Sequence, residues 1–169
     1  GGRPDQARAL EKDGIVTYLH VPSPKLLEMF LQDGATRFVF EGKECGGHVG
    51  PRTSFVLWEQ MSEEIIRFLA SKSRVEATAY HVLFAGGIHD ALSASMVAAI
   101  AAPLAELGVR IGISMGTGYI FTTEAVSTGA IVPAFQEAAL KSQATVLFET
   151  GPGHAIRCAD TPYRELFNQ

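Results

Sequence analysis

The residues best suited to chemistry lie in a glycine-rich segment, Gly42 to Gly50, which reads Gly-Lys-Glu-Cys-Gly-Gly-His-Val-Gly. Glycine has no Cβ and tolerates positive φ, so such a loop lets backbone amides approach a bound ligand closely. Its histidine, His48, is the side chain best able to exchange a proton near neutral pH. A flat, anionic cofactor together with a proton-transfer step would account for this combination.

Two further glycine segments follow apolar runs later in the chain, Gly86-Gly87 and Gly116-Thr117-Gly118. Backbone amides in such turns, helped by the Thr117 hydroxyl, could cradle a phosphate group. The alternative is that both are ordinary tight turns between a strand and a helix. Gly46 and Gly47 could lie against the same cofactor.

The elements that must position these loops alternate between strand and helix. Strands are expected at 15–21, 37–41, 80–85 and 109–115, with a further extended piece at 145–148. Helices are expected at 4–13, 24–33, 55–71, 90–107 and around 133–141. Strands separated by helices of this length pair in parallel, so the three glycine loops should share one edge of the sheet, the predicted ligand edge. An open doubly wound sheet and part of a (β/α)8 barrel both fit this pattern.

The composition narrows the classes of function. The chain has 169 residues, is 47% hydrophobic and carries a formal net charge of -4, which predicts a single domain over 1–169 and argues against nucleic acid as a partner. Its N-terminus does not resemble a signal peptide, and no apolar run approaches the ~18 residues that span a bilayer. The two cysteines favour a reducing, cytoplasmic setting. No spacing typical of a zinc or di-iron site is present, so no metal is expected.

Three motifs in register resemble the nitronate monooxygenase family (2-nitropropane dioxygenase-like flavoproteins) and the related FMN-dependent enoyl-acyl-carrier-protein reductases. The histidine loop of that family reads Gly-x-Glu-Ala-Gly-Gly-His-x-Gly, and here Cys45 stands in place of the alanine. Segments 84–88 and 114–121 are similar to the family's Ala-Gly-Gly-Ile turn and to its phosphate-binding Met-Gly-Thr segment. The tail, at 135–140 and 153–157, resembles the family's closing helix and extension.

The resemblance covers the later half of a (β/α)8 TIM barrel, about four βα units with a C-terminal helical extension. It implies bound FMN, NAD(P)H as a candidate electron donor, and His48 as the acid/base group. The residues that it places around the cofactor are Gly46, Gly47, Gly86, Gly87, Gly116 and Thr117. It also implies that the missing half of the barrel comes from the same polypeptide or from another chain. A free half would leave two unpaired strand edges and an exposed apolar interior face.

Several functions are compatible with these residues. The leading hypothesis is an FMN-dependent oxidoreductase of the nitronate monooxygenase type, which oxidises alkyl nitronates with oxygen. Within the same class, an enoyl reductase would act on an acyl thioester, and both 148–154 and Cys45 resemble versions found inside polyketide-synthase-type proteins. From other classes, the alternatives are a non-catalytic half-barrel module for assembly and, more weakly, a phosphosugar-binding or isomerase barrel without flavin.

The other reactive side chains are expected to be structural. Cys45 is interpreted as a small buried residue rather than a nucleophile. His20 and His154 are interpreted as hydrogen-bonded structural residues, and His89 as a structural residue near a helix N-terminus. Arg52 is interpreted as a solvated loop charge. Phe55 and Trp58 are expected in the core.

Overall fold

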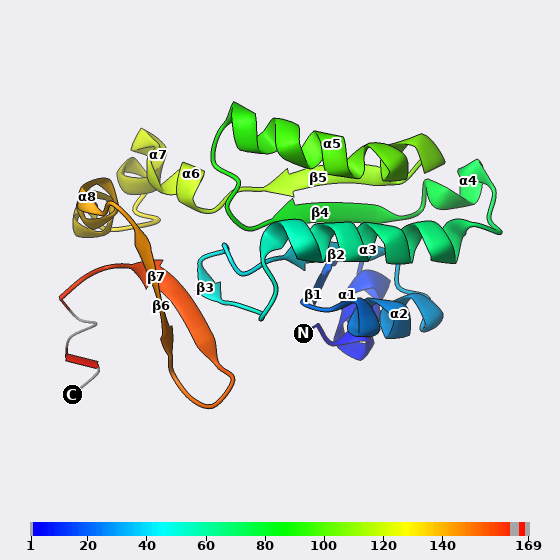
Figure 1. Ribbon diagram of the computed structural model, residues 1–169, viewed down its shortest axis with the longest axis horizontal. Helices are drawn as coiled ribbons and strands as arrows, with labels where there is room; N and C mark the ends of the chain where they lie inside the picture. The colour runs from blue at the N-terminus through cyan, green and yellow to red at the C-terminus, as the bar shows by residue number, and fades with distance from the viewer. Residues whose placement is uncertain (1, 163–165, 168–169) are drawn as a thin grey trace.

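A four-stranded parallel sheet forms the centre of the molecule in the computed structural model, which describes residues 2–162 and 166–167 (Figure 1). The strands are hydrogen-bonded in the order β1 (Leu19–Val21), β2 (Arg37–Glu41), β4 (His81–Ala85) and β5 (Arg110–Ser114). All of these pairings are parallel, as the alternation of strands and helices predicts. The expected α/β architecture, with its parallel sheet of βα units, is confirmed, although β1 begins four residues later than expected.

The long connecting helices begin and end within two residues of the predicted bounds, and one short helix was not predicted. They are α1 (Pro4–Lys12), α2 (Pro24–Gln32), α3 (Ser54–Leu69), the short α4 (Arg74–Ala77) and α5 (Ala91–Leu107). The Ser23 side chain caps α2 by accepting from the Leu26 N–H, and Asp90 with Ser93 forms a capping box at the start of α5. Figure 1 shows α3 and α5 side by side along the sheet, where they contact each other.

The hydrophobic core lies between these helices and one face of the sheet. Alternate strand residues point into it, and Phe38, Phe40 and Phe84 are fully buried there. Trp58 of α3 packs edge-on against Phe84, with ring centroids 5.7 Å apart, and its indole N–H donates to the Phe40 carbonyl at 3.1 Å. Trp58 is therefore a core residue, as expected. Phe55 is not, because it lies on the outer side of the first turn of α3 and is 48% exposed.

The opposite face of the sheet is mostly polar. The register places its residues in rows across neighbouring strands: Arg37, His81 and Arg110; His20, Val39, Leu83 and Gly112; Glu41, Ala85 and Ser114. The expectation of an exposed apolar interior face is therefore wrong. It came from the resemblance to half of a barrel, whose inner face would be apolar. Here α2, α3 and α5 share one face of the sheet, and the other face carries mostly charged and polar side chains.

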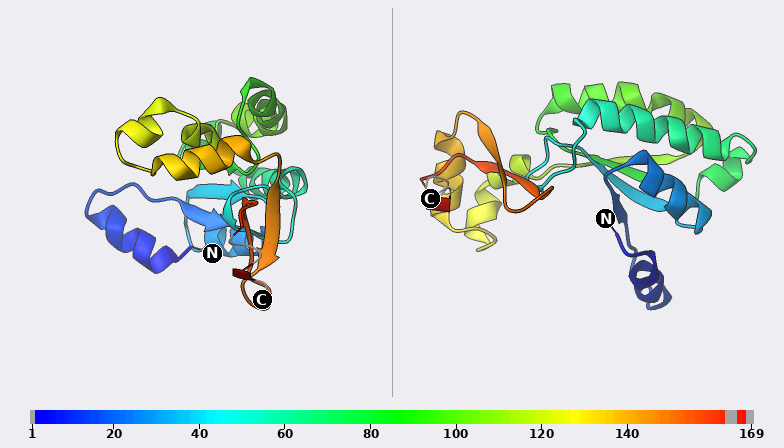
Figure 2. Two further views of the ribbon diagram at one scale, coloured as in Figure 1. Left: turned by 90° about the vertical axis from the view of Figure 1, so that its left-hand side faces the viewer. Right: turned by 60° about the horizontal axis from the view of Figure 1, so that its bottom comes forward.

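The C-terminal segment contains strands as well as helices. After α6 (Thr117–Ile120), α7 (Thr123–Ser127) and α8 (Pro133–Lys141), the chain forms an antiparallel hairpin of β6 (Thr145–Glu149) and β7 (Ala155–Ala159). β7 also pairs with β3 (Gly47–His48), so a second, three-stranded sheet has the order β3-β7-β6. The C-terminal extension is thus only partly helical, because an antiparallel hairpin follows its three short helices. Figure 2 shows this segment beyond the end of the parallel sheet toward which the strands point.

Within the described residues, the structure contains no helix with both the length and the apolar character needed to cross a membrane.

Candidate functional site

The glycine loops that follow β2, β4 and β5 lie next to one another at the carboxyl edge of the sheet. The Gly42 N–H donates to the Ala85 carbonyl at 3.1 Å, which ties the first loop to the end of β4. A Cβ built on Gly86 would lie 3.2 Å from the Gly42 nitrogen, so these two loops are in contact. A Cβ on Gly118 would lie 3.8 Å from the His89 carbonyl oxygen, which brings the third loop against the second. The shared edge expected from the sequence is therefore present.

The start of helix α3 holds the first two loops together. The Ser54 hydroxyl is buried and donates to the Gly86 carbonyl at 3.0 Å. The Ser54 N–H donates to Glu44 Oε2 at 2.6 Å, so a loop carboxylate caps the helix, since Thr53 provides no side-chain cap. Sequence reasoning missed both Glu44 and Ser54. The only local signal was an acidic residue ten positions before the helix start.

The turns after β4 and β5 present free backbone amides. Among the described residues, the N–H groups of Gly87, Gly116 and Thr117 donate to no protein acceptor. All three residues are exposed, and a Cβ on Gly116 would meet no atom within 4 Å. Gly87 has φ 79°, a left-handed conformation that favours glycine. Two adjacent turns with open amides and a hydroxyl fit a phosphate group, which is held through its oxygen atoms.

His48 lies on the other side of the first loop, in β3. Its side chain is exposed, and its ring lies against that of His154, with centroids 5.3 Å apart in an edge-to-face arrangement. Within the ranges that the structure describes, no hydrogen bond, ion pair or ring contact joins His48 to the Gly87 or Gly116 turns. The structure thus brings the two candidate phosphate turns together and places His48 next to the C-terminal hairpin. Gly46 and Gly47, the other two candidates, are exposed beside it, and Gly47 has φ 82°.

Cys45 is buried between the loop and the sheet. Its thiol donates to the His48 carbonyl at 3.7 Å. Burial, together with the neighbouring Glu41 carboxylate, raises the pKa of the Cys45 thiol to about 12. The thiol is therefore neutral at physiological pH and unsuited to nucleophilic attack. The interpretation of Cys45 as a small buried residue is confirmed.

Two other histidines have local structural contacts. His20 Nε2 lies 2.5 Å from Glu41 Oε2, and this neighbouring imidazole lowers the pKa of the Glu41 carboxyl. His89 Nδ1 lies 2.9 Å from the Gly87 carbonyl oxygen, and the His89 N–H donates to Ser93 Oγ at 3.0 Å. His20 therefore contacts the last residue of β2, and His89 contacts the turn that follows β4. Among the described residues, no group of three or more His, Cys, Asp or Glu side chains is placed to hold a metal ion.

The class of protein follows from the parallel sheet of βα units and from its likeness to a solved structure: the chain has the fold of part of a (β/α)8 barrel. The structure of FabK from Thermotoga maritima is similar to this chain, with 27% sequence identity and a TM-score of 0.73, covering 99% of this chain and 47% of that one. A FabK mutant from the same organism gives 26% identity and a TM-score of 0.68, covering 99% and 48%. The chain thus spans about half the length of the solved structures that it matches. No protein-family model and no curated protein sequence matches it significantly.

Proposed function

We propose that this chain is the later half of an FMN-dependent (β/α)8 oxidoreductase that reduces an enoyl thioester. The observation that carries the proposal is the likeness to FabK, an FMN-dependent enoyl-acyl-carrier-protein reductase that uses NAD(P)H, over 99% of this chain. This likeness favours the enoyl reductase over the nitronate monooxygenase within the same family. The adjacency of the three glycine loops at one sheet edge supports the flavin site that both activities share.

Every candidate residue except Gly86, which is buried against Gly42 and Ser54, has a role in this proposal. FMN, when bound, supplies the hydride that the reaction requires. The free amides of Gly87, Gly116 and Thr117, with the Thr117 hydroxyl, would hold its phosphate. Gly46 and Gly47 would let the loop approach the flavin ring because they carry no Cβ. Next to them, His48 would donate a proton to the alkene carbon beside the thioester carbonyl.

We infer that further strands complete the barrel, from the same polypeptide or from another chain. In the described residues, β1 and β5 end the parallel sheet and each has one edge without a partner strand. Parallel edges with free N–H and C=O groups invite such pairing. The setting within a polyketide synthase stays a prediction that rests on the sequence of 148–154 and on Cys45.

The cofactor assignment predicts a preference for FMN over riboflavin, which lacks the phosphate. We expect FMN to bind at least about 10–100-fold more tightly, since even one hydrogen bond to a charged group contributes about 1.5–3 kcal/mol. The measurement is a fluorescence titration of this chain fused to the part of FabK that it does not match. The Thr117→Val variant should weaken FMN binding and leave riboflavin binding unchanged. Equal affinity for the two flavins would contradict the phosphate cradle, and a fusion that binds no flavin would favour the non-catalytic module.

The reaction is tested with the same fusion loaded with FMN. We expect NAD(P)H to be consumed when a short enoyl thioester is added, and the saturated thioester to accumulate in equal amount. Oxygen uptake with a nitroalkane, in the absence of thioester reduction, would instead support the nitronate monooxygenase. A saturated acyl thioester serves as the control substrate, because it has the same thioester group but no alkene to reduce.

A further inference from the structure

The C-terminal hairpin, defined here as residues 145–159, binds the loop that carries His48. Strand β7 pairs with β3 through Gly47 opposite Arg157 and His48 opposite Ile156. One residue further on, the Val49 N–H donates to the Ala155 carbonyl at 3.0 Å. Figure 1 shows β3 next to β7, at the end of the parallel sheet. The backbone on both sides of the His48 side chain is therefore held by the hairpin.

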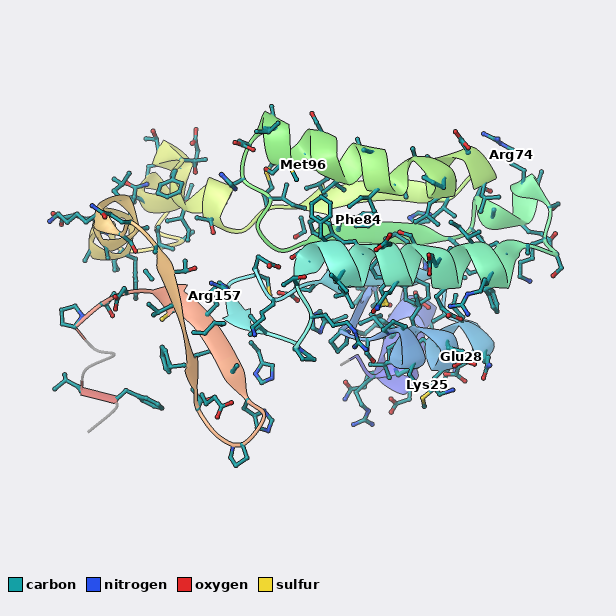
Figure 3. The ribbon with its side chains drawn as sticks, in the orientation of Figure 1. Lys25, Glu28, Arg74, Phe84, Met96 and Arg157 are labelled. Atoms are coloured by element: carbon teal, nitrogen blue, oxygen red, sulfur yellow. The ribbon has the colours of Figure 1, made fainter. Side chains whose placement is uncertain are left out.

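Arg157 adds a side-chain connection to this pairing. Its Nε donates to the Lys43 carbonyl at 2.9 Å, and its Nη1 donates to Thr145 Oγ1 at 2.8 Å. One guanidinium thus joins the beginning of the loop, its own strand β7 and the neighbouring strand β6 (Figure 3). A planar group with several fixed donors suits such a connection, because little freedom is lost for each hydrogen bond.

The two ends of the loop are held in different ways. On the sheet side, the Lys43 N–H donates to the Arg52 carbonyl at 2.8 Å and the Cys45 N–H to the Gly42 carbonyl at 3.1 Å. Gly46, Gly47 and His48 are exposed, and the last two contact β7 and His154 at the hairpin turn. Within the loop itself, the His48 carbonyl accepts only the long hydrogen bond from the Cys45 thiol. The position of the imidazole therefore depends on the hairpin more than on the parallel sheet.

We propose that the C-terminal hairpin is a positioning element for His48, and that Arg157 is the positioning residue that holds the loop on it. The catalytic consequence rests on the proposed function, whereas the effect on the loop does not. Without the Arg157 side-chain contacts, the loop would keep its sheet-side hydrogen bonds, and its connection to the hairpin would rest on the short β3–β7 backbone pairing alone. The imidazole would then sample several positions, and a displacement of about 1 Å at a reacting group can cost about 10²-fold in rate.

The first test measures amide hydrogen exchange in the 169-residue chain. We expect Arg157→Leu to speed exchange at the Val49 amide by about 10-fold or more, because it removes a charged hydrogen bond worth about 1.5–3 kcal/mol. Exchange in β2 and β4 should not change. Arg157→Lys, which keeps the charge and one donor group, should have a smaller effect. The matched control is Arg67→Leu, since Arg67 is an exposed residue of α3 that pairs with Glu64 away from the loop.

The second test measures turnover in the FMN-loaded fusion. We expect Arg157→Leu to lower kcat by about 10-fold or more with FMN affinity unchanged, because the loop and not the phosphate turns is disturbed. Unchanged Val49 exchange in Arg157→Leu would overturn the proposal, whatever the activity. Faster exchange with an unchanged kcat would overturn the catalytic role. A fusion that is inactive even with the wild-type sequence would count against the proposed function alone, and the exchange experiment would still decide whether the hairpin holds the loop.

Discussion

Replacement of His48 by alanine is expected to lower kcat for enoyl-thioester reduction by about 10²–10⁴-fold, the usual contribution of a positioned acid/base group. The affinity for FMN should stay close to that of the wild type, because the candidate phosphate turns at Gly87 and Gly116 have no recorded contact with His48 among the described residues. The measurement is the rate of NAD(P)H consumption in the fusion with FMN and thioester at saturating concentrations. This variant should have the largest effect on activity of any single side chain discussed above.

His81→Asn is the matched control for this experiment. His81 begins β4, at the end of the strand opposite to Gly86, and its Nδ1 lies 3.2 Å from the Tyr18 hydroxyl oxygen. Burial and the neighbouring Arg110 and Arg37 lower its pKa, so the ring is neutral near pH 7. Residues at that end of a barrel strand contribute to stability, and kcat should therefore be unchanged. A His48→Ala variant that keeps more than about a tenth of the wild-type kcat would contradict the assigned acid/base role.

The second large effect is expected on stability, from Gly42→Ala. A Cβ on Gly42 would lie 2.2 Å from Ser54 Cα and 2.6 Å from the Ser54 nitrogen, which are backbone atoms at the start of α3. Backbone atoms cannot rotate away as a side chain can, so either the loop or the helix must move. The free energy of unfolding should fall by about 3 kcal/mol, at the upper end of the usual cost of overpacking. Urea denaturation followed by circular dichroism measures this change.

Gly46→Ala provides the comparison within the same loop. Its Cβ would meet no atom within 4 Å, and Gly46 is not among the glycines with positive φ. Its free energy of unfolding should stay within about 0.5 kcal/mol of the wild type, as for most surface substitutions. If the two variants unfold at the same urea concentration, the close packing of Gly42 against Ser54 does not contribute to stability as described here.

The parallel sheet and its ligand edge could be predicted because their signals are local. Apolar runs such as 37–41 and 80–85 are followed directly by glycine turns, and helices long enough for parallel crossovers separate them. These features require no knowledge of distant contacts. The starts of α2 and α5 were predictable for the same reason, since Ser23 and Asp90 cap helices that begin at the next residue.

The β3–β7 pairing could not be predicted in this way. Strand β3 has two residues, which is too short for any periodic pattern, and all five residues of β7 are partly buried without alternation. The polar face of the sheet was likewise misjudged, because the character of a single strand does not show which of its faces the helices cover. The register across β2, β4 and β5 shows it directly.

Residue types and short spacings in this chain were enough to indicate a parallel α/β sheet, three glycine turns at one edge and a candidate acid/base histidine beside them. The folded structure was needed to reveal how that histidine is held. Arg157 donates to the carbonyl of Lys43, which lies 114 residues earlier in the chain, and Glu44 caps a helix that begins ten residues after it. Such contacts depend on the packing of whole elements in three dimensions, and no local pattern of residues specifies them.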